Sequence, residues 1–285
     1  MSAQEPSQRY LGLELGGSRR TAVLCLEYSH KDKKIFLVES RAHLHGSREE
    51  TADEVLIRTV NSLSPGKIGV DAPLTFPPCL ICEVDECPGS SNCTKESVRW
   101  MREESERRRW SKAKFPPPYT HRPVDLLMRG RWQDDAPLPI PAEEAFGSGR
   151  APLTARMSYL RRHLDCKSLL EVSPRYALVG IAPWYGISVR ELRRCREMEH
   201  GAENRFTILN KLTAKPEFPA LPQIVLYMTD LVAIAKDLAA FDALLCALMP
   251  IFGDLGLLEA PELDPSWGNI ARPKTLPKRQ GETWV

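Results

Sequence analysis

The chain has 285 residues and a formal net charge of +2 at pH 7, with 42% hydrophobic and 27% charged residues. This composition is that of a globular protein, and the small net charge excludes a surface that is strongly basic overall, so a nucleic-acid partner would need a local patch. The first ten residues contain no apolar stretch and no later segment is long enough to cross a bilayer, which predicts a cytoplasmic protein with reduced thiols and no membrane partner.

The N-terminal part of the sequence predicts a sheet with an α/β connection. Short apolar, β-prone segments indicate strands at residues 10–15, 21–27, 35–44 and 68–70, and helical periodicity indicates a helix at 49–63. The first two strands form a hairpin around Gly16 and Gly17. Three strands, a helix and a further strand are typical of a mixed sheet.

Two carboxylates accompany these strands. Asp71 follows the strand at 68–70 and precedes Pro73, which cannot donate to a sheet. Ligand-handling groups of α/β proteins gather at such strand ends, although a loop-capping role is the simpler alternative. Glu14 interrupts the apolar first strand, where it is either an exposed edge residue or a partner of Asp71. Since adjacent strands lie about 4.8 Å apart, these two side chains could share a cation.

Residues 77–94 form a cysteine-rich insertion with the spacing C-x2-C-x4-C-x5-C. Four thiolates in so short a segment predict a structural zinc ion, with an iron–sulfur cluster, or free or disulfide-paired cysteines, as alternatives. Residues 95–114 then read as a helix with two tryptophans and eight basic side chains, which is either a solvated face or a surface for a phosphate backbone. The four cysteines are Cys79, Cys82, Cys87 and Cys93.

Two further carboxylates lie in the second half of the chain. Glu171 ends another short apolar strand. Residues 231–252 read as one long helix that Asp230 caps, and in a helical projection Asp242 falls inside the apolar stripe, whereas Asp237 falls on the solvated side. A carboxylate within a buried stripe is a functional candidate, and a hydrogen bond to backbone is its alternative explanation.

The four acids together suggest a metal site. Converging carboxylates cannot all ionise without a compensating cation, and Mg²⁺ or Mn²⁺ suits oxygen ligands. Two such ions about 3.5–4 Å apart would bind the attacking water and the leaving oxygen of a phosphodiester. One acid on the first strand, one after the fourth strand and one on the last helix is the layout of the RNase H-like fold. The sequence therefore predicts an α/β protein with an RNase H-like mixed sheet flanked by helices.

Six ordered segments also carry a resemblance. They are L-G-L-E-L-G-G-S, I-G-V-D-A-P-L, H-R-P-V-D-L-L-M-R, L-L-E-V-S-P-R, G-A-E-N-R-F-T-I-L and F-D-A-L-L-C-A-L, and they cover most of residues 9–252. In these segments the chain resembles the predicted RNase H-like nucleases grouped as domain-of-unknown-function family 429. The resemblance implies an RNase H-like core and a Mg²⁺- or Mn²⁺-dependent nuclease that acts on DNA or RNA.

The resemblance further implies residue roles. Asp71, Glu171 and Asp242 match acidic positions of the family. Arg122, Asp125 and Arg205 match polar positions with an expected role in contacting substrate phosphate. Glu14 departs from the family, where aspartate is usual, and its extra methylene shifts the carboxylate. In the expected two-metal mechanism Asp71 bridges the ions, Glu14 and Asp242 each complete one, and Glu171 orients the water.

In this interpretation residues 9–74 and 119–252 form the core, 75–118 the cysteine-rich and basic-helix insertion, and 253–285 a C-terminal tail. One alternative function is an ATP-binding phosphotransferase or ATPase of the sugar-kinase and actin superfamily, because Gly16-Gly17 resembles its first phosphate-binding turn, although a second glycine turn is missing. The other is a catalytically degenerate RNase H-like module that binds nucleic acid or a protein partner.

Overall fold

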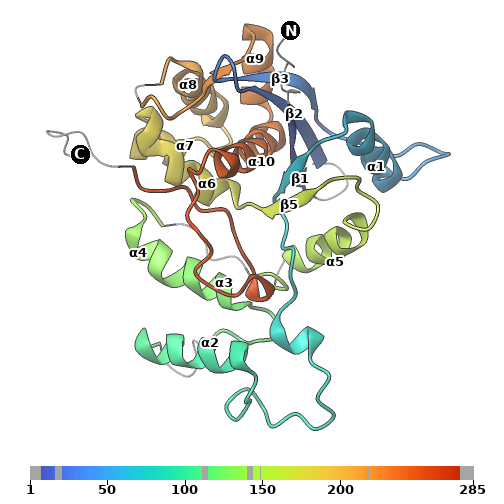
Figure 1. Cartoon of the computed structure of the whole chain (residues 1–285), viewed down its shortest axis with the longest axis vertical. Helices are drawn as coiled ribbons and strands as arrows, with labels where there is room; N and C mark the ends of the chain where they lie inside the picture. The colour runs from blue at the N-terminus through green and yellow to red at the C-terminus, as the bar shows by residue number, and fades with distance from the viewer. Residues whose placement is uncertain are drawn as a thin grey trace, which may run out of the picture.

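A six-stranded mixed sheet forms the centre of the fold, with strand order β5-β4-β1-β2-β3-β6 (Figure 1). The computed structural model describes residues 8–276 except 17–20, 111–114, 140–143, 148 and 217. Strands β1, β4 and β5 run parallel, β3 and β6 run parallel, and β2 is antiparallel to both of its neighbours. The strands are β1 (Gln8–Leu15), β2 (Thr21–Ser29), β3 (Lys34–Arg41), β4 (Lys67–Val70), β5 (Ser168–Glu171) and β6 (Gln223–Val225). The predicted α/β class and mixed sheet are confirmed, whereas β6 was not foreseen.

Helices cover both faces of the sheet. Helix α10 (Leu238–Asp254) packs across β1, β2 and β4 on one face. The other face is covered by α1 (Ala52–Leu63) and α5 (Arg150–Leu160), whose apolar side chains meet those of β1, β2 and β4. Because successive side chains of a strand point to opposite faces, each central strand contributes to two separate hydrophobic cores.

Two glycines allow α10 to lie unusually close to the sheet. A Cβ atom on Gly12 of β1 would lie 1.8 Å from the carbonyl oxygen of Ala243, and one on Gly69 of β4 would lie 2.0 Å from that of Cys246. Any side chain at either strand position would therefore push the helix outward. Glycine within a strand is a known marker of such close backbone approach.

The predicted helix at 231–252 is wrong in its boundaries. The structure has two helices, α9 (Met228–Lys236) and α10, separated at Asp237. The carboxylate of Asp237 accepts a hydrogen bond from the amide of Ala240 and so caps α10, and it also pairs with His43 at 2.6 Å. Asp230, expected as the cap, lies instead in the first turn of α9. Capping by Asp237 is a local signal that the apolar periodicity of the segment obscured.

None of the described helices is long and apolar enough to cross a membrane. A π-helical turn (Met128–Trp132) leads directly into α4. The remaining helices are α2 (Glu96–Arg107), α3 (Pro123–Leu127), α4 (Gln133–Asp135), α6 (Pro174–Ile181), α7 (Val189–Arg194) and α8 (Gly201–Thr213).

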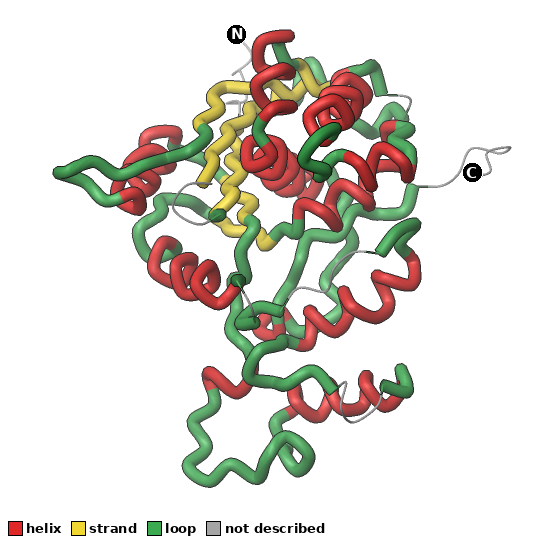
Figure 2. The backbone as a smooth tube through the Cα atoms, turned by 180° about the vertical axis from the view of Figure 1, so that it is seen from behind, coloured by secondary structure: helices red, strands yellow, loops and turns green. Residues whose placement is uncertain are grey.

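The cysteine-rich segment and α2 lie together at one end of the molecule, away from the sheet (Figure 2). The chain after α10 returns to the sheet, where Ile270 forms a parallel bridge with Glu171 of β5. It also reaches α2, since the rings of Trp267 and Trp100 lie 6.3 Å apart. The described part of the tail therefore packs against both the sheet and the insertion.

Candidate active site

Strand register brings three of the predicted acids together. Glu14 lies two residues after Gly12 and so points to the face that α10 covers, and Asp71 stands in the same relation to Gly69. The amide of Asp71 donates to the carbonyl of Leu13 at 2.9 Å, which places Asp71 beside Glu14. Asp242 enters from α10, which the two glycines hold against these strands.

Glu14 is the least compensated member of this cluster, which we call the acid cluster (Glu14, Asp71 and Asp242). Burial, followed by the negative charges of Asp71 and Asp242 and a hydrogen bond with Asp71, raises the pKa of Glu14 well above its ordinary value. Its Oε2 atom is buried and has no hydrogen-bond partner among the described residues. A hydrogen bond between two carboxyl groups requires a proton on one of them, so the cluster favours binding either a proton or a cation.

Two arginines neutralise the other two acids. Arg150, the first residue of α5, donates from Nη1 and Nη2 to Oδ1 of Asp71, both at 3.2 Å. Arg196, just after α7, binds both carboxylate oxygens of Asp242, with a distance of 2.8 Å from Nη1 to Oδ2. Burial nevertheless raises the pKa of Asp242, because the opposing charge of Arg196 only partly offsets it.

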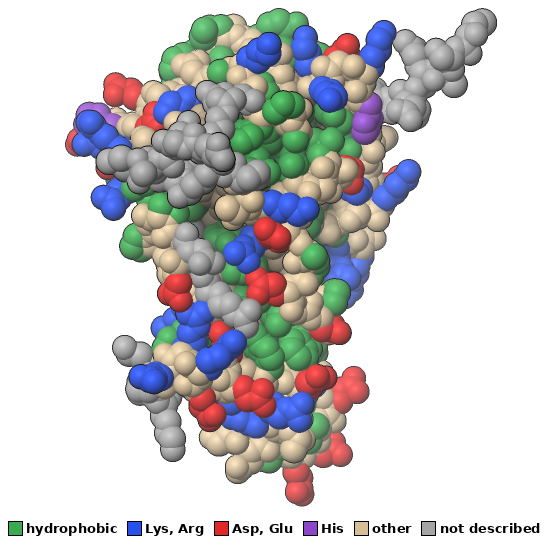
Figure 3. All heavy atoms as spheres, turned by 60° about the vertical axis from the view of Figure 1, so that its left-hand side comes forward, with side chains coloured by type: hydrophobic (Ala, Val, Ile, Leu, Met, Phe, Trp, Pro, Cys, Tyr) green, Lys and Arg blue, Asp and Glu red, His purple; other side chains and the backbone are tan. Residues whose placement is uncertain are grey.

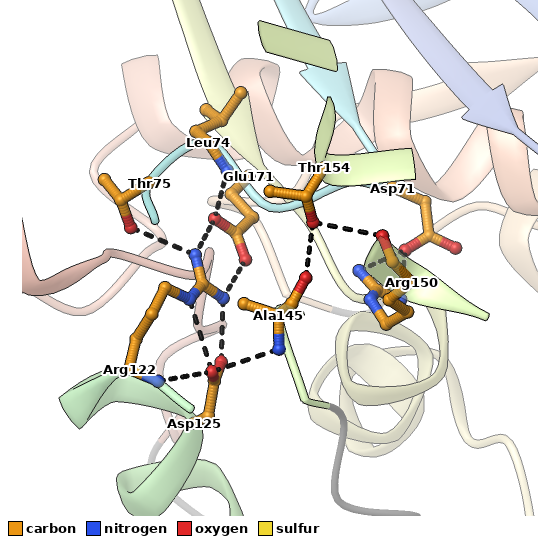
Figure 4. Close-up of polar contacts among 9 residues, drawn as sticks. All are labelled: Asp71, Leu74, Thr75, Arg122, Asp125, Ala145, Arg150, Thr154 and Glu171. Atoms are coloured by element: carbon orange, nitrogen blue, oxygen red, sulfur yellow. Dashed lines mark hydrogen bonds and ion pairs between the residues drawn. The ribbon is translucent and has the colours of Figure 1, made fainter. Parts of the chain in front are cut away.

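Glu171 does not join the acid cluster. In the register of β4 and β5, Glu171 pairs with Val70, so it faces the side of the sheet opposite to that of Gly69 and Asp71. Its carboxylate accepts hydrogen bonds from both terminal nitrogens of Arg122 at 2.7 Å and from the amide of Leu74 at 2.9 Å (Figure 4). The expected role of Glu171 in orienting a water molecule at the metal site is therefore corrected to that of a buried structural acid.

Arg122 and Asp125 complete this second network, which we call the buried network (Arg122, Asp125 and Glu171). The guanidinium of Arg122 lies between the carboxylates of Asp125 and Glu171, and Asp71 and Arg150 lie apart from them (Figure 4). Burial lowers the pKa of Arg122, but the two carboxylates outweigh it and raise the pKa overall. All three side chains are only 2% exposed, so their position contradicts the expected contact of Arg122 and Asp125 with substrate phosphate.

Arg205 is also buried, and its position contradicts the same expectation. It donates to the carbonyl of Ala235 at 2.7 Å and to that of Cys195 at 2.6 Å. Arg205 thus joins the C-terminal end of α9 to the residue before Arg196. Its guanidinium is directed at these backbone carbonyls, and only 6% of the residue is exposed to solvent.

The described residues contain no group of three or more His, Cys, Asp or Glu side chains arranged to hold a metal ion. At the acid cluster, Asp71 and Asp242 instead face arginines. The donor set itself suits a hard cation: three carboxylates, one of them with an unpartnered buried oxygen. A cation that displaced one arginine would supply the compensating positive charge that Glu14 lacks.

The four cysteines of the insertion lie near one another without forming a ligand shell. Burial, and then the neighbouring thiols of Cys93, Cys82 and Cys87, raise the pKa of Cys79. Cys79 and Cys87 are exposed and the other two are half-buried, and all four are free. The zinc site therefore stays a prediction from spacing, and so does its iron–sulfur alternative.

The basic side chains of α2 are largely used within the insertion. Arg102 donates to the carbonyls of Ser90 and Cys93, both at 2.8 Å, and the buried carboxylate of Glu104 pairs with Arg107 and Arg108. Acidic and basic side chains are intermixed over this end of the molecule (Figure 3). This arrangement favours the solvated-face alternative over a continuous basic surface; residues 111–114 lie outside the described part.

Sequence reasoning missed Arg150 and Arg196. Neither stands in a motif, and each is one of many arginines in its neighbourhood, so only tertiary structure selects them. The glycine turn of the phosphotransferase alternative lies, from Gly17 onward, outside the described residues. Comparison of the chain with protein-family models, with curated proteins and with solved structures found no match.

Proposed function

We propose that the protein is a metal-dependent hydrolase of nucleic-acid phosphodiesters with an RNase H-like fold. The observation on which this rests is the acid cluster at the carboxyl ends of β1 and β4. Its three carboxylates lie together, and burial, followed by the negative charges of Asp71 and Asp242, raises the pKa of Glu14. A buried carboxylate without compensation is costly to the fold, and such perturbed groups gather at functional sites.

The sheet topology supports the RNase H-like part of the proposal. The three N-terminal strands form an antiparallel meander, β4 is added parallel to β1, and β5 is added parallel to β4, each after a helical connection. The acids come from the first strand, from the end of the adjacent parallel strand and from the last long helix. This is the layout expected from the sequence, with the difference that Glu171 faces away.

Each residue of the acid cluster has a role in this proposal. Glu14, Asp71 and Asp242 would hold Mg²⁺ or Mn²⁺, and 16% of the Asp71 side chain is exposed to solvent. The bound ion would lower the pKa of a water molecule and offset the charge of the phosphate. Arg150 and Arg196 are each partly exposed and could turn from a carboxylate to a substrate phosphate once a cation replaces them.

The test is cleavage of labelled single-stranded, duplex and hybrid DNA and RNA in the presence of Mg²⁺ or Mn²⁺. Asp71→Asn removes a ligand charge, and Asp165→Asn, at an exposed acid outside the cluster, is the matched control. We expect metal-dependent cleavage by the wild type and the control, and a loss of at least about 100-fold in Asp71→Asn. Equal background cleavage in all three proteins would refute the proposal, and binding without cleavage would indicate the degenerate binding module.

A further inference from the structure

A cavity of about 340 Å³ opens between α6 and α7, next to the acid cluster. Its place is defined by Arg196, which lines the cavity and also binds Asp242. Pockets for small molecules range from about 300 to 1,000 Å³, so this one has room for one small ligand and not for a duplex.

The charge of the cavity wall is positive. Three arginines line it, namely Arg175 at the start of α6, Arg193 near the end of α7 and Arg196, and none of its lining residues in the described part of the chain is acidic. Arg175 lies close enough to Asp242 for its charge to oppose the rise in that pKa. Within the part of the chain that the structure describes, Arg175 and Arg193 form no ion pair. The guanidinium groups of Arg175 and Arg193 are thus available to bind an anion in the cavity.

The rest of the wall is apolar. Leu178 and Val179 of α6, Leu192 of α7 and Leu138 form most of it. Guanidinium groups bind phosphate through paired hydrogen bonds, and an aliphatic wall favours a flat, weakly polar body such as a nucleobase. An inorganic anion would leave this apolar surface uncovered.

We propose that the cavity binds a single nucleotide, with its phosphate on Arg175 and Arg193 and its base against the aliphatic wall. This inference rests on the proposed function and extends to the substrate. The substrate would be a strand end whose terminal nucleotide occupies the cavity while the adjoining phosphodiester lies at the acid cluster. The site would then favour nucleic acid with a free end over closed circles.

Binding can be measured without catalysis, by calorimetric titration of the full chain with AMP in EDTA. Adenosine and inorganic phosphate are titrated in parallel. Arg193→Glu reverses one charge of the cavity, and Arg194→Glu is the matched control, because Arg194 is its exposed neighbour on α7 and does not line the cavity. We expect saturable AMP binding that Arg193→Glu weakens about tenfold or more and that Arg194→Glu leaves unchanged.

The result separates the inference from the proposed function. AMP binding with the expected mutant pattern supports the cavity even if no substrate is cleaved. No saturable AMP binding, equal weakening in both variants, or phosphate alone binding as tightly as AMP would overturn it, even if the protein proves to be a nuclease. Asp71→Asn should retain AMP binding whether or not it abolishes cleavage.

Discussion

Replacing Glu14 with glutamine should stabilise the protein at neutral pH. The substitution keeps the shape of the side chain and removes the charge that Asp71 and Asp242 oppose. The amide nitrogen of glutamine can also donate to a neighbouring carboxylate, which an ionised glutamate cannot do. Residues kept for function often lower the stability of the fold, so replacing one of them commonly gives such a gain in stability.

The size of the effect follows from the unpartnered Oε2 atom of Glu14. A buried polar group without a partner costs about 1–3 kcal/mol, so Glu14→Gln should raise the free energy of unfolding by about that amount. In a chain of this size each kcal/mol shifts Tm by about 2–4 °C. The sign depends on pH, because the pKa of Glu14 is raised in the folded state. The stability that protonated Glu14 contributes is complete below its ordinary pKa of 4.5 and is lost as pH rises through the folded value.

Urea unfolding followed by circular dichroism between about pH 4 and pH 8 gives the comparison. The gain of Glu14→Gln over wild type should be small at the acid end and grow as pH rises. Glu49→Gln, at an exposed glutamate, should show no such trend. A Glu14→Gln variant less stable than wild type at neutral pH, or a gain that does not vary with pH, would refute the electrostatic account of the cluster.

Three further predictions concern the packing of α10, the buried network and the cysteine-rich insertion. Gly69→Ala should lower the free energy of unfolding by about 1–3 kcal/mol or more, measured in urea, because its Cβ would meet the carbonyl of Cys246; a neutral effect would contradict the close packing of α10. Arg122→Ala should cost about 3–5 kcal/mol, because it leaves two buried carboxylates unpaired, and unchanged thermal unfolding would disprove that burial. Elemental analysis should find one zinc ion per chain, lost on Cys79→Ser; a metal-free wild-type protein would rule out the site.

The sequence predicted the sheet well because its strands are marked by strong local signals. Apolar runs defined β1, β2 and β4 closely, with a glycine pair after β1 and a proline after β4 as end signals, and the helical period defined α1. The break between α9 and α10 was missed because the apolar period continues across Asp237. A cap of one residue is a weaker signal than a stripe of several apolar side chains.

Of the four acids that the sequence predicted to converge, three form the acid cluster, and the reason why the fourth does not is physical. Strand-end position identified Asp71 and Glu171 alike, but the face of the sheet depends on register, and β5 pairs so that Glu171 points the other way. Gly12 and Gly69 in the strands were the available signal for a closely packed helix. The pairing of arginines with acids depends on tertiary contacts, which no local pattern contains.

Binding of Mn²⁺ to the pure protein, followed by electron paramagnetic resonance, tests the central claim most directly. The acid cluster predicts saturable binding of Mn²⁺ at neutral pH that Asp71→Asn and Glu14→Gln each weaken and that Asp165→Asn leaves unchanged. Binding should also weaken as pH falls, because the raised pKa of Glu14 makes protons compete with the metal. Equal Mn²⁺ binding by all four proteins, or none by any, would contradict a cation site at these three carboxylates.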